Sequence, residues 1–287
     1  MKIISTFFLT IVFSISLLAE IPNSEKNILI KLHQTTNGSQ WTKKWDLKAP
    51  VSNWYGITIK NDHVVSINLS DNNLVGTLPN EITNLNNLQE LNLFKNQISG
   101  TIPQTIGNLK SLKELNLSFN KLSGNIPNSI CEIPHLNSLV LFMNALSGEL
   151  PNQIGNLKEL EVVSLFNNEL SGELPASLYQ LKNLKELMLS SNKFSGTISW
   201  NVENLKSLEN LSLFDNKMNG HIPYVLAKLD NLKSVNLSYN SFTGAVSQAL
   251  AQKEDFNLTM VNESGVAFQL GVSDNKKGAF AADDFSE

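Results

Sequence analysis

Hydrophobic and polar positions recur along this chain with a fixed period of 24 residues. The pattern is clearest at Leu88, where the chain reads LQELNLFKNQISGTIPQTIGNLKS, and it starts again at Leu112. Eight copies run from Val64 to about Leu250 without insertion or deletion. They begin at Val64, Leu88, Leu112, Leu136, Leu160, Leu184, Leu208 and Leu232. Self-similarity at a fixed period in the twenties indicates a solenoid, in which each copy packs on its neighbours.

Each copy contains one short stretch of alternating character. The fourth and sixth positions are aliphatic, as in Leu91 and Leu93, whereas the residues beside them are mostly polar. Alternation with a period of two predicts a strand with one buried face. One strand per copy, always in the same direction, predicts a parallel sheet.

Three further positions of the copy have a physical role in this arrangement. The ninth is Asn in all eight copies, and its amide can satisfy backbone groups where the chain leaves the strand, so that stacked copies would form a ladder. The thirteenth is Gly in all eight, which suits a tight turn with positive φ or a close backbone approach. A proline follows where a helical turn would start, at Pro79, Pro103, Pro127, Pro151, Pro175 and Pro223.

This set of positions resembles the LxxLxLxxNxLxGxIPxxIGxLxx form of the leucine-rich repeat, best known from plant receptor-kinase ectodomains and polygalacturonase inhibitors. The resemblance covers about two-thirds of the chain. It implies an α/β solenoid, a right-handed superhelix with a parallel concave sheet, made of eight repeats plus N- and C-terminal caps. Proteins with this repeat generally display their binding residues on the concave sheet.

The ends of the chain differ from the repeats. Residues 1–19 carry one positive charge at Lys2 and then an apolar stretch, which is typical of a secretory signal peptide cleaved after Ala19. An uncleaved anchor is the alternative, but the apolar run is shorter than the roughly 20 residues of a spanning helix. We therefore expect a chain that is secreted or held at the cell surface or in the periplasm, without a stable membrane anchor. The expected segments are a signal peptide at 1–19, an N-terminal cap at 20–63, repeats at 64–250, a C-terminal cap strand at 251–272 and a disordered tail at 273–287.

The N-terminal cap is expected to begin with a helix. Ser24 can cap this helix, and Glu25 lies in its first turn. Trp41, Trp45 and Trp54 follow closely, in a chain that has four Trp. We expect these indoles to cover the exposed end of the leucine core, because the first coil of a solenoid needs protection from water. A ligand-binding aromatic cluster is the alternative interpretation.

Cysteine usage separates this chain from the plant proteins that it resembles. The segment SNWYGITI is similar to the CxWxGVxC cap of plant-type ectodomains, but Ser52 and Ile59 occupy the cysteine positions. This cap therefore has no disulfide and is closer to the caps of secreted microbial repeat proteins. The single cysteine, Cys131, has no neighbouring His to activate it, so we expect a buried, inert thiol and not a nucleophile.

Charge and motifs argue against several functions. The net charge of −4 comes without a basic patch, which argues against nucleic acid as a partner. The four His are scattered, acidic residues such as Asp71 and Asp215 are far apart in repeat number, and no GxSxG, HExxH, CxxC or phosphate loop occurs. We expect no enzyme activity, no cofactor and no metal.

The seventh position of the copy holds only Phe or Ser. Alternation sends this position away from the buried leucines, toward the concave face. Exposed apolar surface with a polar rim usually marks a partner site. The predicted ligand-binding strip, drawn from this position and its neighbours, comprises Phe94, Phe119, Phe142, Met143, Phe166, Met188, Phe214 and Tyr239. The alternative is that these rings pack as structure.

Around this strip, charged residues of both signs are available, such as Glu90, Lys113, Lys185 and Glu209. Mixed charge around aromatic side chains suits a protein or a peptide, and rings can also stack on sugars. The predicted function is non-catalytic extracellular recognition of a protein, peptide or polysaccharide. Two alternatives stay open: a structural or adhesive surface protein, and a secreted inhibitor of a foreign wall-degrading hydrolase, as the plant inhibitors with this repeat are.

Overall fold

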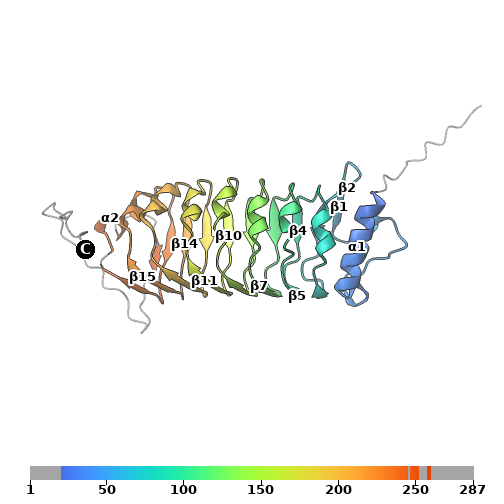
Figure 1. The fold of residues 1–287 in the computed structure, drawn as a ribbon, viewed down its shortest axis with the longest axis horizontal. Helices are drawn as coiled ribbons and strands as arrows, with labels where there is room; N and C mark the ends of the chain where they lie inside the picture. The colour runs from blue at the N-terminus through green and yellow to red at the C-terminus, as the bar shows by residue number, and fades with distance from the viewer. Residues whose placement is uncertain (1–20, 245, 252–256, 260–287) are drawn as a thin grey trace, which may run out of the picture.

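The computed structural model describes residues 21–244, 246–251 and 257–259, which form an elongated stack of coils (Figure 1). Helix α1 (Asn23–Thr35) lies at one end of the stack, and helix α2 (Gln248–Ala251) lies at the other. The expected signal peptide, the expected tail and most of the expected segment 251–272 lie outside the described residues. The architecture confirms the predicted α/β solenoid with a parallel sheet.

The concave sheet contains one strand from each copy. Parallel pairing runs from β2 onward, with Ile67 beside Leu91 and Leu91 beside Leu115, so that each strand lies in register with the same positions of the next copy. At the N-terminal end, β1 pairs with β2 in the antiparallel direction. In spatial order the strands are β1 (Ile57–Lys60), β2 (His63–Asn68), β4 (Glu90–Asn92), β6 (Glu114–Asn116), β8 (Ser138–Val140), β10 (Val162–Ser164), β12 (Glu186–Met188), β14 (Asn210–Ser212), β16 (Ser234–Asn236) and β18 (Asn257–Thr259).

A second parallel sheet lies where the chain turns away from the concave face, and the sequence pattern did not predict it. Its strands are β3 (Val75–Thr77), β5 (Gln97–Gly100), β7 (Lys121–Gly124), β9 (Ala145–Gly148), β11 (Glu169–Glu173), β13 (Lys193–Gly196), β15 (Lys217–His221) and β17 (Ser241–Thr243). The thirteenth-position glycine lies in or directly beside these strands. A Cβ at Gly124 would lie 3.0 Å from Thr101 Cγ2, so a side chain of the preceding copy occupies that space.

Short 3₁₀ helices form the convex side. Pro79, Pro127, Pro175 and Pro223 directly precede four of these helices, as predicted, and each proline carbonyl accepts a hydrogen bond from the first turn. The helices of this side are η3 (Asn80–Asn84), η4 (Ile106–Asn108), η5 (Asn128–Glu132), η6 (Ile154–Asn156), η7 (Ala176–Gln180), η8 (Trp200–Asn204) and η9 (Tyr224–Lys228), whereas η1 (Gly38–Gln40) and η2 (Val51–Asn53) precede the repeats. Between the two sides, aliphatic residues such as Leu91, Leu93 and Ile106 are completely buried in one continuous core.

The ninth-position asparagines form the predicted ladder of hydrogen bonds. The Asn144 amide accepts a hydrogen bond from the backbone N–H of Leu122, 2.9 Å away, in the preceding copy. It donates to the carbonyls of Leu117 and Leu141 at 3.0 and 3.1 Å. One side chain thus satisfies backbone groups of two copies at the turn, where no regular strand pairing could do so.

Backbone φ is positive at two positions of the copy. The thirteenth-position glycines all have positive φ, as predicted, from Gly76 to Gly244. The eighth position is left-handed as well, which the sequence analysis missed, at Asp71, Lys95, Phe119, Met143, Asn167, Ser191, Asp215 and Tyr239. The left-handed region is disfavoured for residues with a Cβ and most of all for β-branched ones. The absence of Val, Ile and Thr from all eight of these positions is the sequence signal that could have predicted this conformation.

The expectation that Ser24 caps α1 is wrong. Pro22 occupies the N-cap position, no side chain caps the first turn, and Ser24 lies inside the helix. The Glu25 carboxylate of that turn instead accepts a hydrogen bond from the Val64 N–H at 2.8 Å and lies 2.6 Å from His63 Nδ1. Because Glu25 is buried against β2, its contacts join the helix to the first strand of the repeats.

The three neighbouring tryptophans cover the N-terminal end of the core. Trp41, Trp45 and Trp54 are 1%, 6% and 2% exposed, and the rings of Trp45 and Trp54 stack with centroids 4.7 Å apart. Each indole N–H donates to a backbone carbonyl, for example that of Trp41 to Thr36 at 2.9 Å. Because so little of each ring is exposed, the structure supports the structural interpretation of this cluster over the ligand-binding one.

None of the helices in the described part of the chain has both the length and the hydropathy to cross a bilayer.

Candidate functional site

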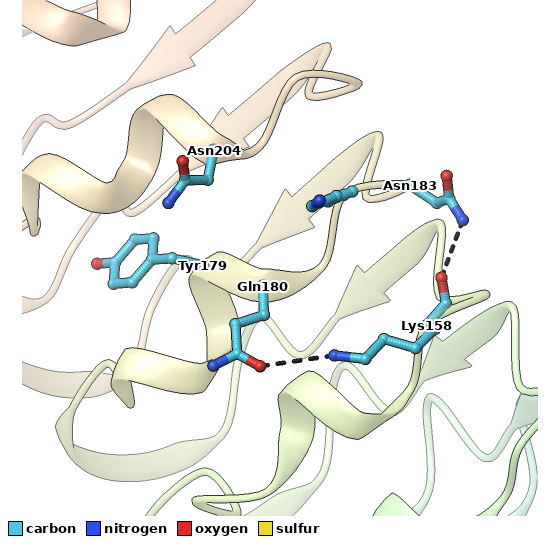
Figure 2. Close-up of a pocket in the computed structure, with 6 residues that line it drawn as sticks. Lys158, Tyr179, Gln180, Asn183 and Asn204 are labelled. Atoms are coloured by element: carbon cyan, nitrogen blue, oxygen red, sulfur yellow. Dashed lines mark hydrogen bonds between the residues drawn. The ribbon is translucent and has the colours of Figure 1, made fainter.

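Two surfaces of the solenoid are candidates for a site, and the first is a pocket on the convex side that the sequence analysis did not predict (Figure 2). Its volume is about 630 Å³. Two hydrogen bonds join residues that line it. Asn183 Nδ2 donates to the Lys158 carbonyl at 2.9 Å, and Lys158 Nζ donates to Gln180 Oε1 at 3.5 Å. The lining residues are Lys158, Tyr179, Gln180, Lys182, Asn183 and Asn204.

The second candidate is the predicted strip on the concave face. The four seventh-position rings, at Phe94, Phe142, Phe166 and Phe214, follow their strands by two residues and are half-buried. The eighth-position side chains are more open to solvent, with exposed fractions of 45% for Phe119, 38% for Met143 and 40% for Tyr239. Met188, the last residue of β12, is half-buried.

The structure brings most of these rings into contact. Phe142 and Phe166 stack with centroids 4.3 Å apart, and Phe94 lies 6.3 Å from both Phe119 and Phe142. We call Phe94, Phe119, Phe142 and Phe166 the aromatic cluster. Phe214 and Tyr239 form a separate edge-to-face pair at 5.1 Å, which we call the second pair. Ser190 occupies the seventh position of the copy between these two groups, so the strip is divided and not a continuous row.

The seventh position does not always face water, contrary to the expectation from strand alternation. Ser118 is fully buried although it occupies the same position as Phe94 and Phe142 in the copy between them. Two strand intervals would separate these rings by about 9.6 Å, but their centroids are 6.3 Å apart. The rings therefore lean toward each other across the small serine, whose hydroxyl donates to Asn116 Oδ1.

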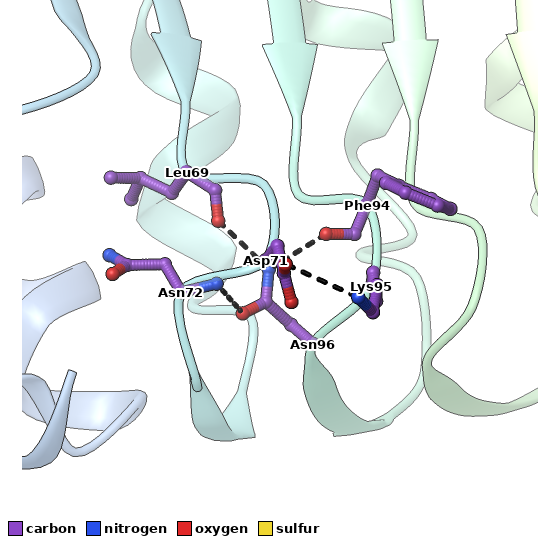
Figure 3. A network of polar contacts seen from close by, with 6 residues as sticks. All are labelled: Leu69, Asp71, Asn72, Phe94, Lys95 and Asn96. Carbon is purple, nitrogen blue, oxygen red and sulfur yellow. Dashed lines mark hydrogen bonds and ion pairs between the residues drawn. The ribbon is translucent and has the colours of Figure 1, made fainter. Parts of the chain in front are cut away.

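The turn after each strand holds these side chains in place (Figure 3). The Asp71 N–H donates to the Phe94 carbonyl at 2.8 Å, and the Asn96 amide reaches back to the Leu69 carbonyl at 2.9 Å. The same bond recurs along the cluster, where the Phe119 N–H donates to the Phe142 carbonyl at 2.8 Å. Because these bonds fix the backbone on both sides of the rings, the aromatic surface is ordered before any ligand arrives.

Ion pairs between neighbouring copies border the strip. Lys185 pairs with Glu161 at 2.7 Å, and Lys233 pairs with Glu209. The hydrogen bond with Glu161 raises the pKa of Lys185, and the hydrogen bond with Lys233 lowers the pKa of Glu209. Exposed pairs of this kind add little to stability. They leave charge of both signs at the edge of the concave face.

Two further features of the described residues concern metal binding and the single cysteine. No group of three or more His, Cys, Asp or Glu side chains gathers closely enough among them to hold a metal ion. Cys131 is buried, and burial together with the nearby charge of Glu132 raises the pKa of its thiol to about 11. The expected burial of Cys131 is therefore confirmed, and the raised pKa disfavours the reactive thiolate.

Comparison with known families identifies the repeat. A family profile described as a leucine-rich repeat region matches residues 115–255, and the Leucine Rich Repeat profile matches residues 63–85 and 87–109. Together these matches cover more than half of the chain, which belongs to the leucine-rich repeat family. No curated protein sequence matches it.

Solved structures of plant receptors share the fold. The PEPR1–AtPEP1 crystal structure is 33% identical with a TM-score of 0.75, over 84% of this chain and 38% of that one. The Arabidopsis receptor kinase HAESA, in complex with the peptide hormone IDA and the co-receptor SERK1, is 28% identical with a TM-score of 0.68, over 84% and 46%. The chain thus spans less than half the length of these receptor chains. A plant ice-binding protein, 24% identical with a TM-score of 0.72 over 86% and 87%, shows the same fold.

Proposed function

We propose that the chain is a non-catalytic, extracellular recognition module that binds an extended peptide segment along the aromatic cluster and the second pair. The observation that carries this proposal is the contact between rings from different copies, such as Phe94, Phe142 and Phe166, on a partly exposed concave surface. Export is supported by the signal-peptide pattern of residues 1–19, which lie outside the described residues.

The dimensions and chemistry of the surface suit a peptide. Phe94 and Phe214 are separated by five strand intervals, or roughly 24 Å at about 4.8 Å each. An extended peptide of about seven residues covers that length at about 3.3 Å per residue. Exposed rings such as Phe119 and Tyr239 can receive apolar side chains, and the ion pairs beside the strip can exchange partners with charged side chains.

The similar structures support a peptide over other partners. The HAESA structure is described as a complex with a peptide hormone, and another similar structure is the plant peptide hormone receptor RGFR1 in complex with RGF2. The latter is 36% identical with a TM-score of 0.64, over 68% of this chain and 31% of that one.

The test uses a phage-displayed library of random peptides of roughly seven to ten residues, selected on the full chain. Binding of the enriched peptides is then compared between wild type and the variant F142S/F166S. Serine occupies the seventh position in the copies at Ser70, Ser118, Ser190 and Ser238, so the repeat accommodates it. The matched control, W200N/Y224N, removes two neighbouring exposed rings from the convex side.

The expected result is a loss of affinity of at least about thirtyfold in F142S/F166S, because buried aromatic anchors dominate binding energies. The control should bind like wild type. Enriched peptides that bind F142S/F166S and wild type equally, or a selection that enriches no peptide, would contradict the proposal.

A further inference from the structure

Trp200 and Tyr224 form an exposed aromatic pair on the convex side, away from the concave strip. Their exposed fractions, 53% and 57%, are the highest among the large hydrophobic side chains of the described residues. The ring centroids are 5.2 Å apart, and the rings are inclined by 53°. Each residue is the first of its helix, Trp200 in η8 and Tyr224 in η9. We call these two residues the convex pair.

The repeat itself provides an internal control for this position. Trp200 and Tyr224 occupy the seventeenth position of two consecutive copies. The same position holds Asn80, Gln104, Asn128, Asn152, Ala176 and Gln248 in the other copies. Since the coil forms with amides or alanine there, neither ring is needed for folding. Two adjacent exposed rings without a structural role are therefore a candidate for binding.

The surroundings of the convex pair are polar. Lys228 Nζ lies 5.5 Å from the Tyr224 ring centroid and 3.5 Å from a carboxylate oxygen of Glu203. Asn201 follows Trp200 and is exposed. Donors and acceptors of hydrogen bonds therefore border both rings, and the rings themselves provide two flat apolar faces.

The size of the apolar surface argues against a protein partner. An aromatic side chain can bury about 150–250 Å², so two rings that are about half exposed offer roughly 200–250 Å². A stable protein interface needs about 800 Å² from each partner. Rings with a polar border instead suit a ligand that has small apolar faces and hydroxyl groups at its edges, which is the chemistry of a pyranose sugar.

We infer that the convex pair binds an oligosaccharide, with the axial C–H groups of neighbouring pyranose rings stacked on Trp200 and Tyr224. Their hydroxyls would then bond to Glu203, Lys228 and Asn201. This site is independent of the proposed peptide site, because it uses other residues on the opposite side of the coil.

The convex pocket includes the other end of helix η8. Helix η8 begins at Trp200 and ends at Asn204, which lines the pocket. Its five residues cover roughly 8 Å at about 2 Å per residue. The Tyr179 hydroxyl accepts a hydrogen bond from the Ser199 N–H at 3.2 Å, which joins this pocket residue to the residue directly before Trp200. The amides of Gln180 and Asn204 are suitable partners for the hydroxyls of a longer chain.

The test measures binding of soluble oligosaccharides to the full chain by calorimetry and by tryptophan fluorescence. The probes are cellohexaose, laminarihexaose and chitohexaose as neutral chains and hexagalacturonate as an acidic one. Since Trp41, Trp45 and Trp54 are buried, a change in emission on binding reports on Trp200. Binding of at least one probe by wild type, neutral or acidic, is expected, and the comparison between them identifies the preferred charge.

The variant W200N/Y224N should lower that affinity at least tenfold, whereas F142S/F166S should leave it unchanged. Asparagine is the residue of three other copies at this position, so thermal unfolding of W200N/Y224N should match that of wild type. The inference is overturned if wild type binds none of the four probes, or if the folded W200N/Y224N variant binds as well as wild type. Failure of the peptide selection would not affect this result, and the two proposals can fail separately.

Discussion

The rings of Phe142 and Phe166 stack face to face, with centroids 4.3 Å apart and planes only 8° from parallel. The two residues occupy the same position of consecutive copies, two residues after strands β8 and β10, which pair in register. Translation by one strand interval, about 4.8 Å, therefore brings identical side chains into a stack. In this way a repeated sequence builds an aromatic surface that no single copy contains.

A double-mutant cycle on this stack should reveal coupling. We expect F142S and F166S together to cost less than the sum of the single changes, with a coupling energy of about 0.5–1.5 kcal/mol. Urea unfolding of the four proteins, followed by circular dichroism, measures it. A coupling energy of zero would mean that the rings do not interact in solution. Phe142 and Phe214, which are in separate groups, provide the control pair and should show additive effects.

Replacing an asparagine of the ladder should strongly destabilise the fold. In N144A the backbone groups of Leu122, Leu117 and Leu141 lose their partner, and we expect the free energy of unfolding to fall by about 2–3 kcal/mol. The control N156A, at an exposed residue at the end of η6, should change it by less than about 0.5 kcal/mol. Equal effects of the two changes in denaturant unfolding would show that the ladder is dispensable.

The left-handed eighth position should reject β-branched residues. Ser191 has φ of 51°, so we expect S191V to cost about 1–2 kcal/mol and S191G to stay within about 0.5 kcal/mol of wild type. The matched control is S195V in the extended strand β13, at a position where the first copy has Val75. S195V should be nearly neutral in thermal unfolding. A tolerated S191V would contradict the assigned backbone conformation.

The Cys131 thiol should react slowly in the folded protein. Its pKa is about 11, compared with 9.0 for the free group, so the thiolate fraction at pH 8 is about a hundredfold lower than in the unfolded chain. Rates of labelling by a disulfide reagent, with and without urea, measure this difference. Because the folded pKa is the higher one, the stabilisation from the neutral thiol is complete below pH 9 and decreases as the pH rises toward 11. Rapid labelling of the folded chain at pH 8 would contradict the buried position.

Much of the fold could be predicted because each copy repeats the same information. The aliphatic positions, Asn144 and its equivalents, and the glycines with positive φ all behave as the pattern predicts. The contacts of individual side chains outside the repeats were harder to predict. Serine is a residue type that often caps helices, which is why Ser24 was expected to do so. The contact of Glu25 with His63 and Val64 could not be predicted locally, because it depends on a strand about 40 residues away.

The candidate site was predicted only in part. Alternation identified which positions point toward the concave side, but it treats each residue separately and cannot describe how neighbours cover one another. Ser118 is buried because Phe94 and Phe142 lean over it, and the strip is divided at Ser190 because serine there leaves Phe166 and Phe214 apart.

The sequence by itself determined the solenoid, its period and its polar ladder, since these follow from residues that recur every 24 positions and interact with the same positions of the next copy. Only the tertiary structure decided which rings touch, which remain exposed and where the convex pair lies relative to the pocket. These properties depend on the distances and orientations of side chains from different copies. Those distances and orientations are set only when the coils pack on one another.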